Sequence, residues 1–165
     1  IGRDGEILLD GEDISKHDSH RIVASGLTVV PEGRHIFAPF SVADNLRLGA
    51  IRLSKERSTL SQRFDFVFGL FPRLAERRDQ AGGTLSGGEQ QRVAIARAFV
   101  TQPEYLFADE PTGNLDKKTG QKVMDLLFEL NEQQQSTLIL VTHDEHLANR
   151  CQRQLVLDEG RWVQP

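Results

Sequence analysis

The sequence is poor in cysteine and in long apolar runs, and these two absences exclude several classes of protein. Cys151 is the only cysteine among 165 residues, so an internal disulfide is excluded and a reducing compartment is expected. No run of about 18 apolar residues occurs, so we expect no segment that spans a membrane. The first residues, IGRDGEILLDGEDI, are polar and strand-like, so we expect no signal peptide.

Neither sign of charge dominates the chain as a whole. The formal net charge is −4, with 38% hydrophobic and 27% charged residues, which is typical of one folded domain with a sizeable core. Positive charge gathers within residues 51–100, but Arg77, Arg78, Arg92 and Arg97 come without interleaved stacking aromatics. We therefore expect a solvated helical face and no nucleic-acid partner.

Short apolar runs alternate with helical patterns along the chain. LTVV (27–30), YLFA (105–108) and TLILVT (137–142) read as buried strands, with apolar residues at helical spacing between the later two. This alternation indicates an α/β fold with a parallel sheet that is covered by helices on both faces. Further expected elements are hairpins at Asp10-Gly11 and Glu159-Gly160, a loop at QQQ (133–135) and a helix near residues 145–151.

The segment from Ser41 to about Gln80 has a helical pattern. Ser41 is a suitable N-cap, and apolar residues recur along the segment after it. Four phenylalanines lie between residues 64 and 71, and such residues usually serve core or interface packing rather than a cofactor site.

The stretch TLSGGEQQRVAIARAF (84–99) places two glycines in front of a well-patterned helix. Ser86 and Glu89 form the sequence pattern of a capping box, in which each side chain satisfies a backbone amide of the first turn. Gly87 and Gly88 add bare N–H groups at the positive end of the helix dipole, which suits an anion such as phosphate. Plain capping and phosphate recognition both remain open for this stretch taken alone.

Charged residues follow two of the expected strands directly. YLFA runs into Asp109-Glu110, and TLILVT runs into His143-Asp144, at the sheet edge where α/β folds bind ligands. One carboxylate can hold Mg²⁺ while the other addresses a water, and His143 can hydrogen-bond a phosphate. The alternative is that these are turn and cap residues, which explains Asp144 well. His143, His146 and Cys151 fit no zinc pattern, so we reject a zinc site.

Four motifs in a fixed order carry a family resemblance. LSGGEQ (85–90), LFADEP (106–111), NLD (114–116) and TH (142–143) resemble the signature, Walker B, D-loop and switch histidine of ATP-binding cassette (ABC) ATPases. GEILLDGEDIS resembles the hairpin that follows the first helix in that family, so the resemblance covers essentially the whole chain. It implies a P-loop NTPase-like fold that uses ATP and Mg²⁺.

The resemblance implies a role for each residue of these motifs. Asp109 positions Mg²⁺, Glu110 polarises the attacking water and His143 contacts the γ-phosphate. Glu32 stands where the family has the Q-loop glutamine, and it still offers an oxygen toward Mg²⁺ or its water.

The signature residues act on a nucleotide held mainly by a second copy, according to the same resemblance. The implied partner is therefore a second nucleotide-binding domain in a head-to-tail dimer. Asp116 lies across the dimer seam, and Ser86, Gly87 and Gly88 contact the γ-phosphate. Glu89, Gln90 and Asp116 are further expected nucleotide-binding residues.

The two halves of the chain resemble different subgroups. VPEGR and LFPRLAERRDQ resemble the branched-chain amino-acid importer ATPases. From about residue 98 onward, ADEPTGNLDKKTGQKVMDLLFELN resembles the lipoprotein-release and macrolide-export ATPases. A hybrid chain and an unusual natural member both explain this change of character.

The 165 residues contain no GxxxxGK[ST] phosphate loop, which in the family precedes the point where this chain begins. We therefore expect residues 1–165 to be a partial nucleotide-binding domain, with a helical subdomain at 41–84 that docks transmembrane subunits through residues such as Phe68 and Phe71. The complete protein would couple ATP hydrolysis to transport at the cytoplasmic face of the inner membrane, as a peripheral subunit. The alternatives are a non-transport ABC ATPase and a non-catalytic fragment that acts only as an interaction module.

For the 165 residues by themselves we predict no measurable ATPase activity and ATP binding weaker than millimolar. A lone charge-assisted contact from the signature contributes about 1.5–3 kcal/mol, whereas millimolar binding needs about 4 kcal/mol. Calorimetry and a phosphate-release assay on the purified chain check both statements. Micromolar binding, or turnover that disappears in Glu110→Gln, would contradict them.

Overall fold

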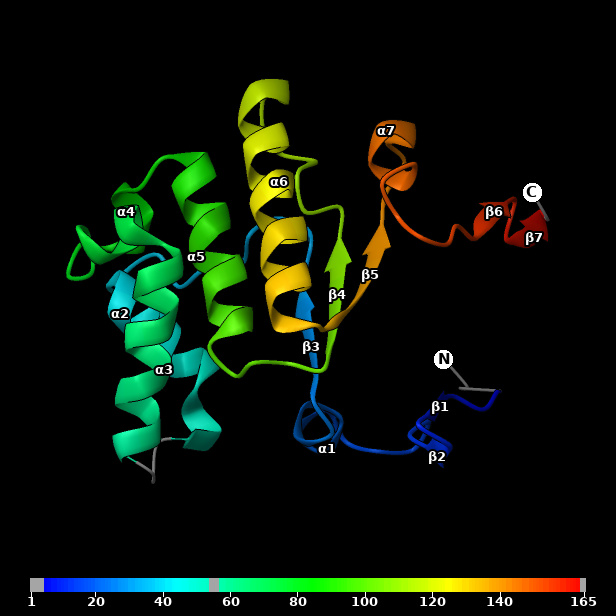
Figure 1. The fold of residues 1–165 in the computed structure, drawn as a ribbon, viewed down its shortest axis with the longest axis horizontal. Helices are drawn as coiled ribbons and strands as arrows, with labels where there is room; N and C mark the ends of the chain where they lie inside the picture. The colour runs from blue at the N-terminus through cyan, green and yellow to red at the C-terminus, as the bar shows by residue number, and fades with distance from the viewer. Residues whose placement is uncertain (1–4, 54–56, 164–165) are drawn as a thin grey trace.

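The computed structural model describes residues 5–53 and 57–163 (Figure 1). Within these residues a parallel sheet has the strand order β3-β4-β5, with β4 in the centre. The register pairs Val29 with Phe107 and Phe107 with Ile139. The α/β class with a parallel sheet is therefore confirmed, and the strands are β3 (Leu27–Val30), β4 (Tyr105–Asp109) and β5 (Thr137–Val141).

Two long helices, α5 (Gly87–Phe99) and α6 (Lys117–Gln134), lie beside the sheet (Figure 1). Val30, Leu106 and Ala108 are fully buried, and they belong to one face because alternate strand residues point the same way. On the opposite face the described residues include exposed apolar side chains, such as Val29 and Val141. The expectation of helices on both faces is thus met on one face only, within the part of the chain that the structure describes.

The expected helical segment after Ser41 is confirmed for its described residues, while residues 54–56 lie outside them. Ser41 is the N-cap, and its hydroxyl accepts from the Asp44 N–H at 3.0 Å. Buried Leu46, Val67 and Leu74 join the core that includes the apolar side of α5. The elements are α2 (Val42–Gly49), η1 (Ile51–Leu53), α3 (Arg57–Leu70), α4 (Pro72–Ala75) and η2 (Gly82–Thr84).

Asn45 fixes the segment that runs from β3 into these helices. Its side chain is fully buried and accepts from the Phe37 N–H at 2.8 Å. The amide group donates to the carbonyls of Phe37, Phe40 and Ser41 at 2.9–3.3 Å. Because buried polar groups must find partners, this set of bonds defines the path of residues 37–41.

Both predicted hairpins are present. Asp10 and Gly11 have φ angles of 50° and 83°, and Glu159 and Gly160 have 46° and 76°, as tight hairpin turns require. The expected loop at 133–135 is wrong for two residues, because α6 continues to Gln134 and only Gln135 leaves the helix, with φ 52°. The remaining elements are β1 (Leu8–Leu9), β2 (Glu12–Asp13), α1 (Ser19–Ala24), α7 (Glu145–Ala148), β6 (Val156–Asp158) and β7 (Arg161–Val163).

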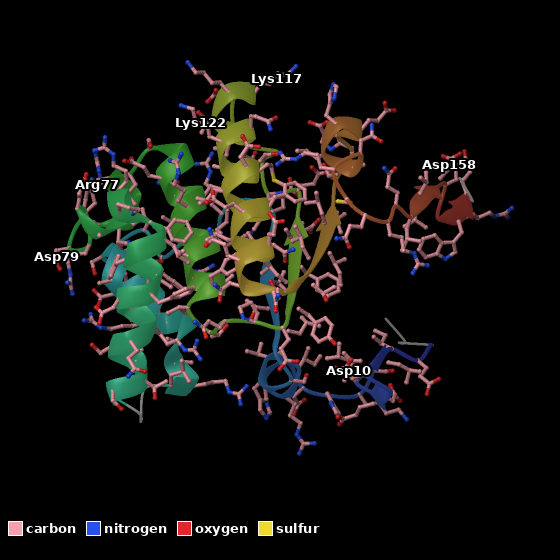
Figure 2. All side chains as sticks on the ribbon, viewed as in Figure 1. Asp10, Arg77, Asp79, Lys117, Lys122 and Asp158 are labelled. Carbon is pink, nitrogen blue, oxygen red and sulfur yellow. The ribbon has the colours of Figure 1, made fainter. Side chains whose placement is uncertain are left out.

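Figure 2 shows Arg77 and Asp79 at the periphery of the molecule, in the turn after α4, and Lys117 and Lys122 at the periphery on α6. The expected solvated helical face is only partly found, because Arg77 and Arg78 are exposed beyond the end of α4, whereas Arg92 and Arg97 on α5 are half-buried. Across the described residues no helix combines the length and the apolar character needed to cross a membrane.

Candidate active site

Glu110 and His143 meet where two neighbouring strands end. Asp109 pairs in register with Val141, so the residues that follow β4 and β5 emerge side by side. Glu110 Oε1 accepts from the backbone N–H of His143 at 2.9 Å and lies 2.7 Å from His143 Nδ1. Glu110 has a φ of 41°, an unusual conformation for a residue with a side chain, and such outliers gather at functional sites. The expected meeting of these two side chains at one sheet edge is therefore found.

The contact with Glu110 sets the electrostatics of His143. The hydrogen bond to Glu110 and its negative charge raise the pKa of the His143 imidazole above its ordinary value. The histidine side chain is 84% exposed, whereas that of Glu110 is 22% exposed. One ring nitrogen is thus fixed by the carboxylate while the rest of the ring remains accessible to a ligand.

Asp109 and Glu32 are exposed carboxylates near the same edge of the sheet. Asp109 ends β4 and lies on the face of Phe107, so it diverges from Glu110 as the strand alternation predicts. Among the residues with described positions no group of three His, Cys, Asp or Glu side chains could hold a metal. Carboxylate oxygens suit Mg²⁺, which usually takes one or two of them together with phosphates and waters. The donor set therefore fits Mg²⁺ in the company of a phosphate ligand.

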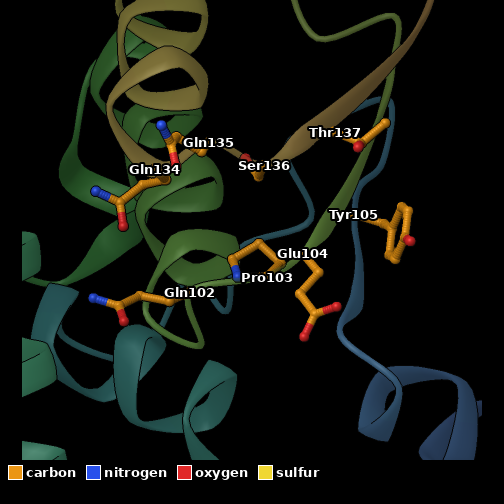
Figure 3. Close-up of a pocket in the computed structure, with 8 residues that line it drawn as sticks. All are labelled: Gln102, Pro103, Glu104, Tyr105, Gln134, Gln135, Ser136 and Thr137. Atoms are coloured by element: carbon orange, nitrogen blue, oxygen red, sulfur yellow. The ribbon is translucent and has the colours of Figure 1, made fainter.

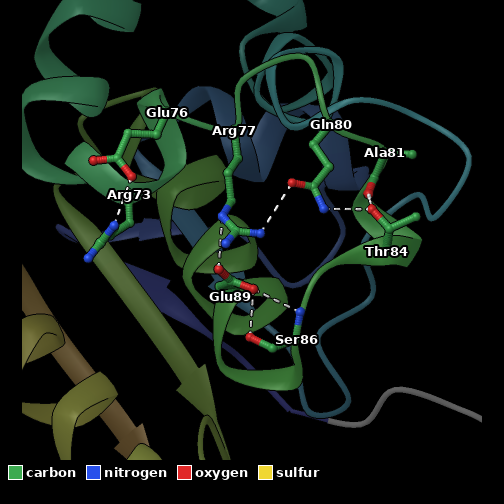
Figure 4. Close-up of polar contacts among 8 residues, drawn as sticks. All are labelled: Arg73, Glu76, Arg77, Gln80, Ala81, Thr84, Ser86 and Glu89. Atoms are coloured by element: carbon green, nitrogen blue, oxygen red, sulfur yellow. Dashed lines mark hydrogen bonds and ion pairs between the residues drawn. The ribbon is translucent and has the colours of Figure 1, made fainter.

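Glu89 completes the capping box predicted at the start of α5. Its Oε2 accepts from the Ser86 N–H at 2.9 Å and from the Ser86 hydroxyl at 2.7 Å, and Arg77 approaches its Oε1 at 3.2 Å (Figure 4). The bond from the Ser86 hydroxyl is the main cause of a lowered pKa for the Glu89 carboxyl. Glu89 supports the loop in this way, and its contact with a nucleotide stays a prediction.

Gly87 and Gly88 also have a packing role that sequence reasoning missed. A Cβ on Gly88 would lie 2.5 Å from Cγ2 of Thr119 in α6, and a Cβ on Gly87 would lie 3.2 Å from the Arg34 guanidinium. Neither glycine has a positive φ. The glycines therefore allow two other segments to approach α5 closely, whether or not they also meet a phosphate.

Gln90 and Asp116 hold the loops beside these glycines. Gln90 Nε2 donates to the carbonyls of Gly82 and Leu85, each at 3.2 Å, and its Oε1 accepts from Arg34 at 3.1 Å. Asp116 is the N-cap of α6 and accepts from the Thr119 N–H at 3.0 Å. Hydrogen bonding with the Thr119 side chain, and next with its backbone, lowers the pKa of the Asp116 carboxyl. The direct roles expected for Gln90 and Asp116 at a nucleotide stay predictions.

A hollow of about 760 Å³ adjoins the Glu110–His143 pair and reaches Asp116 and Arg150. A second hollow of about 410 Å³ lies at the opposite end of the sheet, between residues 102–105 and 134–137 (Figure 3). The second is lined mainly by uncharged polar side chains and lies at the amino ends of the strands, away from the edge where such sheets bind ligands. The first hollow is therefore the candidate site.

Known proteins share both the sequence and the fold. A family model described as "ABC transporter" matches residues 2–113. The chain is 42% identical over 163 residues to the uncharacterized ABC transporter ATP-binding protein YbbA of Escherichia coli K12, covering 97% of this chain and 71% of that protein. It is 38% identical over 165 residues to the lipoprotein-releasing system ATP-binding protein LolD of Syntrophus aciditrophicus, covering 96% and 72%. The chain belongs to the ABC transporter family.

Solved structures of ABC ATPases have the same fold. CbiO1 of Clostridium perfringens, part of an ABC transporter complex, superposes with a TM-score of 0.84 at 27% identity, covering 98% of this chain and 65% of that one. The cassette MJ0796, in a dimeric post-hydrolysis state with ADP and Pi, gives 0.80 at 30% identity, covering 98% and 72%. The P-loop NTPase-like class and the assignment as an ATP-binding subunit of a transporter are thus confirmed, and the chain spans about two thirds to three quarters of these relatives.

Replacing Glu110 by glutamine should lower the pKa of His143 toward its ordinary value, because the amide carries no charge to favour the imidazolium. The Glu110–His143 pair contributes its full stabilisation of the folded state at pH values below the ordinary histidine pKa of about 6.5. This stabilisation is lost as the pH rises through the raised pKa of His143. NMR titration of the His143 ring measures the change. Asp144→Asn is the control, since Asp144 contributes least to the shift; an unchanged titration in Glu110→Gln would mean that the pair does not form.

Proposed function

We propose that Glu110 is the general base of an ATP hydrolysis reaction that drives transport through membrane subunits. The observation that carries this proposal is the contact of Glu110 with His143 at the ends of two adjacent parallel strands. The His143 N–H orients one carboxylate oxygen, and the other oxygen is left to accept a proton from water. Phosphoryl transfer needs mainly such positioning and charge stabilisation, which this edge supplies.

Asp109 and Glu32 would hold Mg²⁺ at this edge through their carboxylates. The ion would neutralise the charge that develops on the phosphate oxygens. His143 would donate a hydrogen bond to the γ-phosphate from the part of its ring that faces solvent, and its raised pKa favours the protonated form that can donate.

A second copy would complete each site. Ser86 is exposed at the first turn of α5, where backbone N–H groups and the helix dipole favour an anion. A head-to-tail dimer would bring Ser86, Gly87 and Gly88 to the γ-phosphate on the other copy, with Asp116 at the seam. The dimeric form of the similar cassette MJ0796 supports this arrangement.

In a longer form of the protein that also carries a phosphate loop, Glu110→Gln should retain ATP binding and lose turnover by about 10²–10⁴-fold. Glu104→Gln is a matched control, because Glu104 is an exposed glutamate that directly precedes the other end of the same strand. Phosphate release measures turnover, and calorimetry measures binding. Near-normal turnover in Glu110→Gln would remove Glu110 from the role of base.

The membrane subunits would dock at an apolar hollow of about 450 Å³ on the helical segment, lined by Phe40, Leu48, Ile51 and Leu60. Phe40 and Ile51 are 46% and 64% exposed, although both are large and apolar. Contact with membrane subunits here would keep the protein at the cytoplasmic face of the inner membrane as a peripheral subunit. The expected partial exposure is met by Phe68, which is half-buried, but it is wrong for Phe71, which is 3% exposed and packs in the core between α3 and α4.

Ile51→Asp should weaken binding to the membrane subunits by about 10-fold or more, because it places a charge at the centre of an apolar contact. Val23→Asp serves as the control, since Val23 is also exposed but lies on α1. Copurification of the ATP-binding subunit with its membrane subunits measures the effect. Full retention in Ile51→Asp would locate the docking surface elsewhere.

A further inference from the structure

Arg34 joins three parts of the chain that are far apart in sequence. Its Nη1 donates to Oε1 of Gln90 in α5 at 3.1 Å, and its Nη2 donates to the carbonyl of Asn114 at 2.9 Å. Asn114 belongs to the loop between Glu110 and Asp116. One side chain therefore connects the turn after β3 with the first turns of α5 and with the loop that begins at the proposed base.

The backbone around Arg34 is held in an unusual conformation. Gly33, Arg34 and His35 have φ angles of 82°, 70° and 42°, and such angles are uncommon for the latter two residue types. Arg97, which is half-buried in α5, donates to the carbonyl of His35 at 2.8 Å. A run of left-handed residues persists only where surrounding contacts specify it, and here those contacts aim the Arg34 side chain at Gln90 and Asn114.

The guanidinium of Arg34 also packs on Gly87. A Cβ at Gly87 would lie 3.2 Å from each of Cζ, Nη1 and Nη2 of Arg34, so the guanidinium lies over the bare backbone of this glycine. The planar fork of arginine can donate to two acceptors at once and still pack against a flat surface, which a lysine ammonium cannot do. The contact thus fits arginine specifically.

We propose that Arg34 is a positioning residue for hydrolysis, which keeps residues 86–88 at a fixed distance from the loop 110–116. The proposal rests on the proposed function, in which the loop that begins at Glu110 acts on this copy's own nucleotide and residues 86–88 act on the nucleotide of the other copy. The distance between the two segments therefore sets how the two sites of the dimer fit together. Arg34 itself touches neither of the reacting atoms; it acts through Gln90, Gly87 and the Asn114 carbonyl.

The first test measures backbone hydrogen exchange in the 165-residue chain. Arg34→Met keeps most of the side-chain volume and removes both hydrogen bonds, so exchange should become faster at residues 86–90 and 113–116 and stay unchanged in β4. Arg34→Lys should resemble Arg34→Met, because it reaches one acceptor at most. Arg73→Met is the matched control: Arg73 is 80% exposed and pairs with Glu76 in its own helix segment, so no change is expected at either loop.

The second test measures turnover in the longer form that carries a phosphate loop. Both Arg34 variants should lower kcat by about 10- to 100-fold, because small misplacements of catalytic groups have effects of this size, with KM for ATP unchanged. Unchanged exchange at both loops, faster exchange throughout including β4, or a raised KM with normal kcat would each overturn the proposal. If Glu110→Gln turns over normally, the proposed function fails, while the exchange measurement still judges the role of Arg34 in holding the two loops.

Discussion

The burial of helix α5 is the constraint on which the rest of the structure depends. Val93, Ile95 and Phe99 are fully buried within one core that also includes residues of the sheet, of the helices after Ser41 and of α6. Each fully buried side chain of this size contributes about 1.5–3 kcal/mol through the hydrophobic effect. The core therefore fixes the position of the helix, and with it the region in which Ser86 to Gly88 lie, while polar contacts set their spacing from the neighbouring loop.

The parallel pairing of β4 and β5 is the second interaction that positions the site, after the burial of α5. The register that pairs Asp109 with Val141 brings the following residues together, so Glu110 and His143 meet without any long-range loop arrangement. Polar groups then connect the start of α5 with the carboxyl ends of these strands. Arg34 links Gln90 at the start of α5 to the loop that leaves β4, and Asp116 caps the helix α6 that follows this loop. The absence of a side chain on Gly88 lets α6 lie against α5.

Structural features that depend on residues within a few positions of one another could be predicted from the sequence. The strands, both hairpins, the capping box and the Ser41 cap follow from residue types within a few positions, and Glu110 with His143 follows from strand ends. Arg34 was missed because its acceptor Asn114 lies 80 residues away. Phe71 was misjudged because it stands at the junction of α3 and α4, where packing rather than helical spacing decides burial. One-sided coverage of the sheet and the use of Gly87 and Gly88 for close packing also depend on contacts between distant segments, and the importer-like character of the first half stays a prediction.

Subunit complementation shows whether Ser86 to Gly88 acts on a nucleotide bound by another copy. In the longer form with a phosphate loop, Ser86→Arg blocks the approach of the signature and Glu110→Gln removes the base, so each variant alone should be inactive. If the signature acts between copies, a mixed dimer has one complete site. In that site Glu110 comes from the Ser86→Arg subunit and Ser86 comes from the Glu110→Gln subunit. Mixing the two inactive variants should then restore ATP turnover. A mixture as inactive as its two components would mean that Ser86 to Gly88 does not act between copies.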